Sequence, residues 1–267
     1  MPELPEVEVV KRSLIIKAQN STIKAIKVID GRLRYKINKN EIRKFIGLKL
    51  KKILRRSKFL IFIFNKNKTM LVHLGMTGKF FFINKNNKKY KTSFYYDLNH
   101  NKDEKHDRVV FYLSKGKKLI YNDIRKFGFI KFLYDSNLFK NSHLKSLGPE
   151  PLSNKFNFSY FKKFINGRKR TIKNILMDQK FVSGLGNIYV NEILFFSRIK
   201  PYKKIENLSD NEIKKIIKFT KKILIKAISF GGSSIKDFSS SSGKKGSFQQ
   251  YFSVYGKKGE NCSNRLC

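Results

Sequence analysis

Apolar residues recur along the chain with two different periods. Residues 6–18 have the spacing of a helix, with one apolar face formed by Val7, Val10, Leu14 and Ala18. Short runs rich in Phe, Ile, Val and Tyr then follow, a pattern typical of strands. These runs are 23–29, 59–64, 79–83, 108–113 and 127–134. The first ~130 residues are therefore predicted to form a β-sandwich or barrel that opens with a helix.

Helical spacing returns after the Gly-Pro-Glu-Pro sequence at 148–151, which is typical of a linker. The predicted helices are 157–165, 171–177, 187–196 and 209–229, the last opening with a capping box, Ser-Asp-Asn-Glu. The polar, lysine-rich stretch 84–107 predicts a long loop. Ser and Gly dominate 231–246, and a short aromatic segment, 248–255, follows. The sequence thus predicts an α+β protein with a second half that is mainly helical.

Lysine and arginine dominate the charged residues. The chain holds 59 Lys and Arg against 19 Asp and Glu, a formal net charge of +40. A compact fold with that charge repels itself unless a polyanion lies near, and nucleic acid is the obvious polyanion. The alternative is a solvated basic surface that reflects AT-rich codons, since Ile, Asn and Phe are also abundant. The charge favours a nucleic-acid partner and by itself fits an RNA-binding protein too.

Cysteine usage and hydropathy indicate the compartment. The two cysteines, Cys262 and Cys267, fall near the end of the sequence and cannot build a disulfide framework, which suits a reducing cytosol. The first residues are acidic and lack the apolar region of a signal peptide. The longest apolar runs, such as 59–64, are too short to span a membrane. We therefore expect a cytoplasmic protein without a membrane partner.

The opening Met-Pro-Glu-Leu-Pro-Glu carries the most informative chemistry. A small second residue lets the initiator methionine be removed, which leaves Pro2 as a free secondary amine. Because an α-amino group has a pKa of about 8, part of it is neutral at pH 7 and can attack a carbon to form an iminium. Glu3 beside it can handle protons at the same centre. The alternative is that proline and glutamate simply suit the first turn of a helix.

Other candidate residues are less specific when taken singly. Lys58 follows two arginines just before a predicted strand, where a solvated lysine is the commoner case. The glycines of 182–187 permit a tight turn and a backbone clamp on DNA, after which Asn187 can cap the next helix or hold a phosphate. Met76, Arg125 and Phe127 have loop-like contexts. Such side chains can replace a base pushed out of a duplex, or can merely fill core or surface.

Taken together, several blocks of sequence resemble bacterial formamidopyrimidine-DNA glycosylase. They occur in order, at near-fixed spacing, from residue 2 to about residue 262. The blocks are the opening hexapeptide, 55–58, 73–78, 105–107, 123–128, 147–152, 176–179, 184–190 and 254–260. The resemblance implies an N-terminal β-sandwich catalytic domain with flanking helices at 1–135 and a linker at 136–152. It further implies a helix-two-turn-helix DNA-binding domain at 153–242 and a partial zinc-finger hairpin at 243–267.

The resemblance also implies a bifunctional glycosylase and abasic-site lyase of base excision repair, acting on 8-oxoguanine and ring-opened purines in duplex DNA. By similarity, Pro2 attacks the anomeric carbon and displaces the base, and Glu3 is the acid that opens the sugar ring. Lys58 matches the lysine assigned to proton donation during β-elimination and to phosphate contact. A monomer is the family expectation.

DNA contacts carry over residue by residue. His106, Arg125, Lys169 and Asn187 fall where the family contacts phosphates. Met76, Arg125 and Phe127 match the residues that fill the gap left by the flipped base. Lys236 ends 231–236, which resembles the loop that closes over oxidised guanine.

The resemblance fails at the zinc finger, where the family has two C-x2-C pairs. Cys262 and Cys267 are spaced C-x4-C, and two sulfurs cannot fill a tetrahedral zinc site. The hairpin arginine assigned to δ-elimination has no counterpart, so we expect weakened DNA binding and impaired δ-elimination. Two rivals stay open: an endonuclease VIII-like enzyme for oxidised pyrimidines, which tends to have Gly where this chain has Leu4, and a DNA-binding relic without catalysis.

Overall fold

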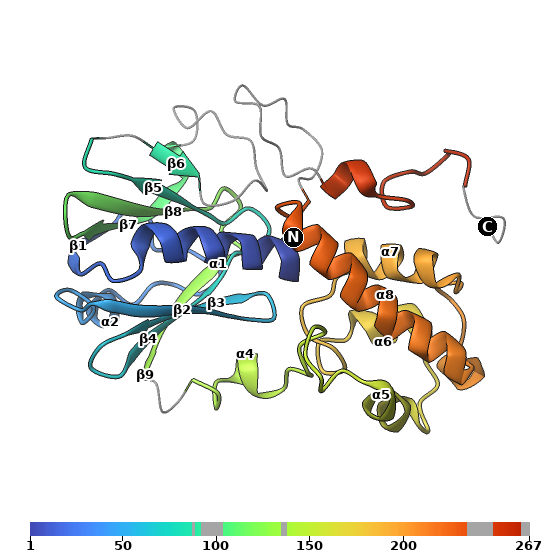
Figure 1. The fold of residues 1–267 in the computed structure, drawn as a ribbon. Coiled ribbons are helices and arrows are strands. Elements are labelled where there is room, and N and C mark those ends of the chain that lie inside the picture. The colour runs from blue at the N-terminus through green and yellow to red at the C-terminus, as the bar shows by residue number, and fades with distance from the viewer. Residues whose placement is uncertain (87–88, 92–103, 135–137, 234–247, 263–267) are drawn as a thin grey trace.

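Two antiparallel sheets form the first half of the molecule and helices form the second (Figure 1). The computed structural model describes residues 1–86, 89–91, 104–134, 138–233 and 248–262. Within them, the strand orders are β1-β7-β8-β5-β6 and β2-β3-β4-β9. The strands are β1 Ile23–Val28, β2 Leu50–Arg56, β3 Phe59–Phe64, β4 Lys68–His73, β5 Lys79–Ile83, β6 Lys89–Lys91, β7 Asp107–Leu113, β8 Lys117–Asn122 and β9 Phe129–Tyr134. The predicted α+β class is confirmed.

Helix α1 connects the two halves. It packs against β2 in the sandwich and against α8 in the helical half, and its N-terminal end points toward α8 in Figure 1. The helices are α1 Leu4–Ala18, α2 Lys39–Arg43, α4 Ser142–Lys145, α5 Phe158–Ile165, α6 Ile172–Met177, α7 Asn187–Ser197 and α8 Asp210–Ser229, with short 3-10 turns at η1 Glu104–His106, η3 Ile205–Asn207 and η4 Phe248–Tyr251. The start of the chain therefore lies where the halves meet.

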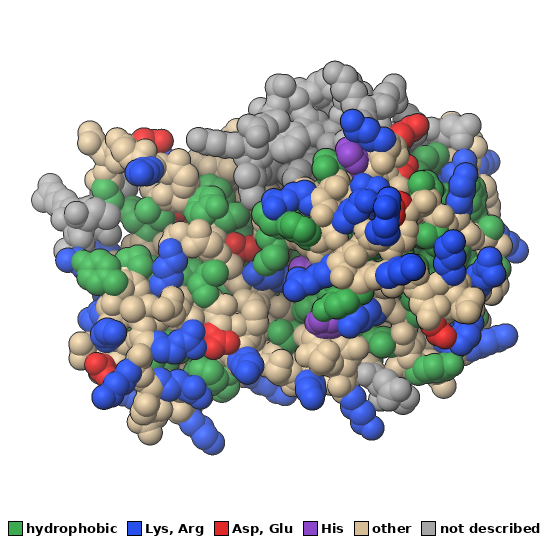
Figure 2. Space-filling view, turned by 180° about the vertical axis from the view of Figure 1, so that it is seen from behind, with side chains coloured by type: hydrophobic (Ala, Val, Ile, Leu, Met, Phe, Trp, Pro, Cys, Tyr) green, Lys and Arg blue, Asp and Glu red, His purple; other side chains and the backbone are tan. Residues whose placement is uncertain are grey.

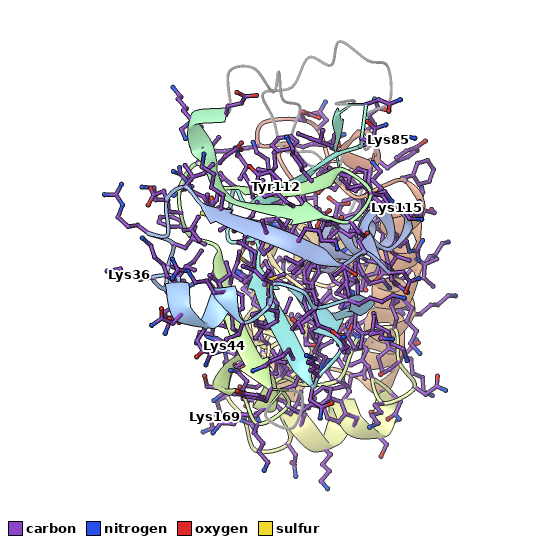
Figure 3. All side chains as sticks on the ribbon, turned by 90° about the vertical axis from the view of Figure 1, so that its left-hand side faces the viewer. Lys36, Lys44, Lys85, Tyr112, Lys115 and Lys169 are labelled. Carbon is purple, nitrogen blue, oxygen red and sulfur yellow. The ribbon has the colours of Figure 1, made fainter. Side chains whose placement is uncertain are left out.

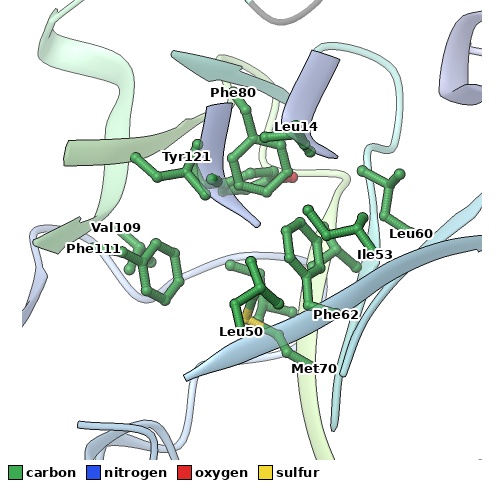
Figure 4. Packing of buried hydrophobic residues seen from close by; sticks show 14 of the residues in the cluster. Leu14, Leu50, Ile53, Leu60, Phe62, Met70, Phe80, Val109, Phe111 and Tyr121 are labelled. Atoms are coloured by element: carbon green, nitrogen blue, oxygen red, sulfur yellow. The ribbon is translucent and has the colours of Figure 1, made fainter. Parts of the chain in front are cut away.

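The core of the sandwich explains both the helical stripe and the apolar strands. All four residues of the predicted stripe of α1 are at most 1% exposed and pack between the sheets. Figure 4 shows Leu14 of α1 beside Phe80 and near Phe62. Strand β3 is apolar throughout because Phe62 enters this core while Ile61 packs into a second cluster on the other face of the sheet.

The helical half has its own core, built around α7 and α8. Helix α8 begins at the predicted capping box: Ser209 Oγ accepts from the Glu212 amide at 3.2 Å, and Glu212 Oε2 accepts from the Ser209 amide at 2.8 Å. This capping box gives hydrogen-bond partners to two amides at the start of the helix that have none within it. No helix among the described residues has the length and apolarity needed to cross a membrane.

Several predicted boundaries were wrong. Helix α1 starts at Leu4 rather than residue 6, because Glu3 caps it and Pro5 suits its first turn. Strands β2, β4 and β8 were not predicted. Lysines and arginines interrupt the apolar residues of β2, β8 opens with two lysines, and β4 has only a short apolar run between polar residues. The stretch 84–107, predicted as loop, contains β6 and η1 within its described residues.

Candidate active site at the junction of the two halves

The chain start is held against the turn that precedes α7. The Leu4 amide donates to the Gly184 carbonyl at 3.0 Å. Gly184 has φ +95°, and a Cβ there would lie 2.8 Å from the Leu4 side chain, so the turn needs glycine for both conformation and space. Pro2 and Glu3 are both buried here. The glycines at 182–187 therefore bring the two halves together at the N-terminus.

The Glu3 carboxylate lies at the N-terminus of α7. Its Oε1 accepts from the Ile188 amide at 3.0 Å, at the positive end of an 11-residue helix. A Cβ on Gly186 would come within 2.5 Å of this carboxylate, so the close approach requires glycine. The other oxygen, Oε2, is buried and finds no hydrogen-bond partner among the described residues. One oxygen thus fixes the carboxyl group and the other is available for proton transfer.

Burial perturbs three ionisable groups at this point. It raises the pKa of Glu3 to about 7, an effect that the nearby Lys58 ammonium opposes and the Glu6 carboxylate reinforces. Burial also lowers the pKa of Lys58, whose side chain belongs to a residue only 6% exposed. The pKa of the Met1 amino group is lowered for the same reason. An acid that holds its proton near pH 7 beside amines that lose theirs more readily suits nucleophilic and acid–base chemistry.

Lys58 differs from the solvated lysine that its local sequence favours. Lys58 directly precedes β3, as predicted, yet it is buried near Glu3 at the junction of the two halves. The three residues before it are held in place by Glu150. The Ser57 amide donates to Glu150 Oε1 at 2.6 Å, and Arg56 Nη1 donates to the same oxygen at 3.0 Å. Arg55 Nη2 lies 2.7 Å from Glu150 Oε2. Glu150 thus ties the β2–β3 turn to the segment between the halves.

Arg56 extends this connection to the helical half. Its Nη1 donates to Ser183 Oγ at 2.8 Å, and its Nη2 donates to the carbonyls of Leu147 and Gly148 at 3.0 and 2.6 Å. Sequence reasoning did not assign Arg56 or Glu150 a role. One available signal was that both occur in blocks of the family resemblance.

Glu6 is a second buried carboxylate that the sequence did not single out. Its Oε1 accepts from the Tyr189 hydroxyl at 2.6 Å and from the amide and hydroxyl of Ser233 at 2.8 and 2.9 Å. Its Oε2 accepts from the Glu3 amide at 2.9 Å. Glu6 therefore joins α1, α7 and the segment after α8 beside the candidate acid.

The residues predicted to enter DNA lie on two loops of the sandwich. Met76 follows β4 and is 36% exposed, while Phe127 precedes β9 and is 47% exposed. The Arg125 guanidinium lies 4.7 Å from the centre of the Phe127 ring. His106 is half-buried, and its Nδ1 lies 3.4 Å from Arg108 Nη2. The loop contexts predicted for Met76, Arg125 and Phe127 are confirmed.

The remaining predicted DNA contacts lie on the helical half or outside the described residues. Lys169 is exposed on the turn between α5 and α6, where it lines a pocket of about 570 Å³, and it points outward in Figure 3. Asn187 is exposed and is the first residue of α7; Gly186 holds the capping position, so the predicted cap role of Asn187 is wrong. Lys236 lies outside the described residues. Figure 2 shows Lys and Arg side chains over both halves of one face, with few acidic ones.

The described residues do not fit a four-ligand zinc site. Among them, no group of three or more His, Cys, Asp or Glu side chains could hold a metal ion. Cys262 is exposed, and Cys267 lies outside the described range. The preceding segment is anchored by a carboxylate instead: Glu192, 1% exposed, accepts from the amides of Ser253, Val254 and Tyr255 at 2.9, 3.0 and 2.8 Å.

The fold and the site together indicate a two-domain enzyme. A β-sandwich is joined to a helical half, and a buried acid, Glu3, and a buried lysine, Lys58, lie where the two meet. Family models give the assignment: one described as the formamidopyrimidine-DNA glycosylase N-terminal domain matches residues 1–130, and one described as the H2TH domain of that enzyme matches residues 147–239. The chain belongs to the formamidopyrimidine-DNA glycosylase family and is a DNA glycosylase of DNA repair.

Individual relatives agree over nearly the whole chain. A formamidopyrimidine-DNA glycosylase from Rickettsia massiliae is 39% identical over 98% of this chain and 88% of its own length. The formamidopyrimidine-DNA glycosylase from Bradyrhizobium is 36% identical over 100% of this chain and 92% of its own length. Among solved structures, a Lactococcus lactis enzyme variant bound to Fapy-dG-containing DNA superimposes with a TM-score of 0.84, at 32% identity, over 99% of this chain and 92% of that one. The Lactococcus lactis enzyme bound to abasic-site DNA superimposes with a TM-score of 0.83, at 31% identity, over 98% of this chain and 91% of that one.

Proposed function

We propose that this enzyme excises oxidised purines, 8-oxoguanine and formamidopyrimidines, from duplex DNA and then cleaves the strand at the abasic site. The observation that carries the proposal is the Glu3 carboxyl group, which lies beside Pro2 and Lys58 and is held by the α7 N-terminus. One of its oxygens is buried and has no hydrogen-bond partner in the described part of the chain. Relatives named for formamidopyrimidine excision, and a neighbour bound to Fapy-dG DNA, support the substrate class.

The chemistry begins once Met1 is removed and the Pro2 nitrogen becomes an amine. The lone pair of this amine attacks C1′ of the damaged nucleotide, and the C1′–base bond breaks, with its electrons leaving on the base. The C1′-bonded nitrogen gives up its N–H proton, which neutralises the departing base, and thereby regains a lone pair. Protonated Glu3 gives its proton to the ring oxygen as the C1′–O4′ bond opens and the nitrogen lone pair forms the C1′=N bond, which leaves an iminium between Pro2 and the open sugar. A carboxyl group with a pKa of about 7 is matched to this proton transfer at neutral pH.

Strand cleavage follows from the iminium. Because the iminium withdraws electrons, a proton is lost from C2′ and the 3′-phosphate leaves in β-elimination. We assign Lys58 the proton donation and the phosphate contact in this step; burial lowers its pKa, which eases transfer of its proton. Water then hydrolyses the iminium and regenerates the amine. A δ-elimination can occur from the same iminium before this hydrolysis, and no described residue is assigned to it.

DNA is held through phosphates and through the gap in the stack. We assign phosphate contacts to His106, Arg125, Lys169 and Asn187, and Lys236 to the loop that covers the everted base. Met76, Arg125 and Phe127 fill the space that the everted base leaves. The exposed loop positions of Met76 and Phe127 and the net charge of +40 support this arrangement.

Borohydride trapping on an 8-oxoguanine duplex tests the proposal. Borohydride reduces the iminium to a stable amine, so the native protein should give a covalent protein–DNA band. Pro2→Gly and a form that retains Met1 are the controls, and both should lose the proline adduct. Absence of the band with duplex binding intact would indicate a non-catalytic DNA-binding protein. A band only on a duplex with an oxidised pyrimidine would indicate the endonuclease VIII-like alternative.

A further inference from the structure

The two loops that carry the exposed apolar side chains are separate connections between the two sheets. Residues 74–78 connect β4 to β5, and residues 123–128 connect β8 to β9. Met76 projects from the first loop, and the stacked pair Arg125 and Phe127 projects from the second. Separate loops have separate motions, so simultaneous insertion into a duplex requires that something fix one to the other.

Glycines bring the two loops into direct backbone contact. Gly75 has φ +63°, and a Cβ there would lie 2.4 Å from the Gly128 nitrogen and from the Phe127 carbonyl carbon. A Cβ on Gly128 would in turn lie 1.8 Å from the Tyr121 hydroxyl. No side chain fits between the loops, and their backbones touch.

One buried carboxylate joins the loops chemically. Asp123 is fully buried, and its Oδ2 accepts from the Gly128 amide at 2.8 Å and from the Tyr121 hydroxyl at 3.4 Å. Its Oδ1 accepts from the Thr77 hydroxyl at 2.5 Å. The Thr77 oxygen also accepts from the Arg125 amide at 2.9 Å. A hydroxyl can donate one hydrogen bond and accept others. Thr77 can therefore donate to Asp123 and accept from the Arg125 amide at the same time.

We propose that Thr77 is a positioning residue that, with Asp123, locks the two loops into one rigid wedge for separating stacked bases. Thr77 acts through the Arg125 amide, from which its hydroxyl oxygen accepts a hydrogen bond. The inference rests on the proposed function, since a wedge that separates stacked bases is needed only when the substrate is duplex DNA. Rigid loops incur the ordering cost during folding rather than during DNA entry. The hydroxyl should therefore matter for a stacked duplex and not for an unstacked strand.

Two substrates and three variants test this role. Thr77→Val removes the hydroxyl and keeps the shape, and Thr77→Ser keeps the hydroxyl. Thr220→Val is the matched control, because Thr220 is fully buried in α8 and its hydroxyl finds no hydrogen-bond partner among the described residues. The substrates are an 8-oxoguanine duplex, which must be opened, and a single-stranded abasic oligonucleotide, which has no paired stack to open.

We expect Thr77→Val to lower kcat/KM on the duplex roughly ten-fold, the effect of one lost hydrogen bond, and to leave cleavage of the single strand within about two-fold of wild type. Thr77→Ser should restore the duplex rate, and Thr220→Val should behave as wild type on both substrates. Equal activity of Thr77→Val and wild type on the duplex would overturn the inference, as would a parallel loss on both substrates. Wild-type inactivity on both substrates would instead refute the proposed function, and the inference with it.

Discussion

Replacing Glu150 tests the connection between the halves. In Glu150→Gln the charge that attracts Arg55 and Arg56 is lost, while one acceptor oxygen remains for the Ser57 amide. Exposed ion pairs contribute ~0–1 kcal/mol, whereas breaking a buried pair costs ~3–5 kcal/mol. The side chains here are 11–22% exposed, which is an intermediate case, so we expect a loss of about 2 kcal/mol in the free energy of unfolding.

That loss should be visible in thermal unfolding. For a chain of this size, ~1 kcal/mol corresponds to roughly 2–4 °C in Tm, so Glu150→Gln should unfold about 4–8 °C below wild type by circular dichroism. The control is Glu41→Gln, because Glu41 pairs with Lys44 at 2.6 Å on an exposed surface and its loss should leave Tm nearly unchanged. A Glu150→Gln Tm within about 1 °C of wild type would show that this network does not hold the halves together.

Two further predictions concern buried carboxylates. Because burial raises the pKa of Glu3 from its ordinary 4.5 to about 7, the folded state retains a proton that the unfolded state has lost, so this group makes stability fall as pH rises between those values. Glu3→Gln should flatten that part of the stability curve in urea titrations, and base excision by wild type should decline above about pH 7; an unchanged curve would contradict the assigned protonation. Glu192→Gln should increase amide exchange at 253–255, since a neutral amide binds three N–H groups less strongly than a carboxylate, and unaltered exchange would exclude the anchor.

The sequence predicted elements well where burial dictates the pattern. Strand β3 was placed correctly because both of its faces are covered, which leaves a continuous apolar run. Strands β2 and β8 were missed because their polar positions carry lysine and arginine without strict alternation. In a chain with 59 basic residues, a lysine conveys little about which face of a strand meets solvent.

The site was predictable in part. The opening residues and Lys58 were assigned from motifs, but Glu6, Glu150 and Glu192 were not, because each acts through partners far away in the sequence. Glu150 reaches Arg56 across 94 positions, and no local pattern encodes such a contact. Acidic residues are scarce here, at 19, and Glu6, Glu150 and Glu192 all lie in buried or partly buried networks that join separate segments. Scarcity of acidic residues was the signal that could have drawn attention to them.

The Glu3–Ile188 hydrogen bond has a consequence for the order of events during synthesis. The two residues are 185 positions apart, so at the usual elongation rates the ribosome makes Ile188 roughly 10–40 s after Glu3. The nascent chain thus carries its first residues in the open before α7 exists to receive them. Once α7 docks, Pro2 is buried, and an aminopeptidase has poor access to the Met1–Pro2 bond. The proposed chemistry requires removal of Met1, and on this account that removal belongs to the early interval before the two halves assemble.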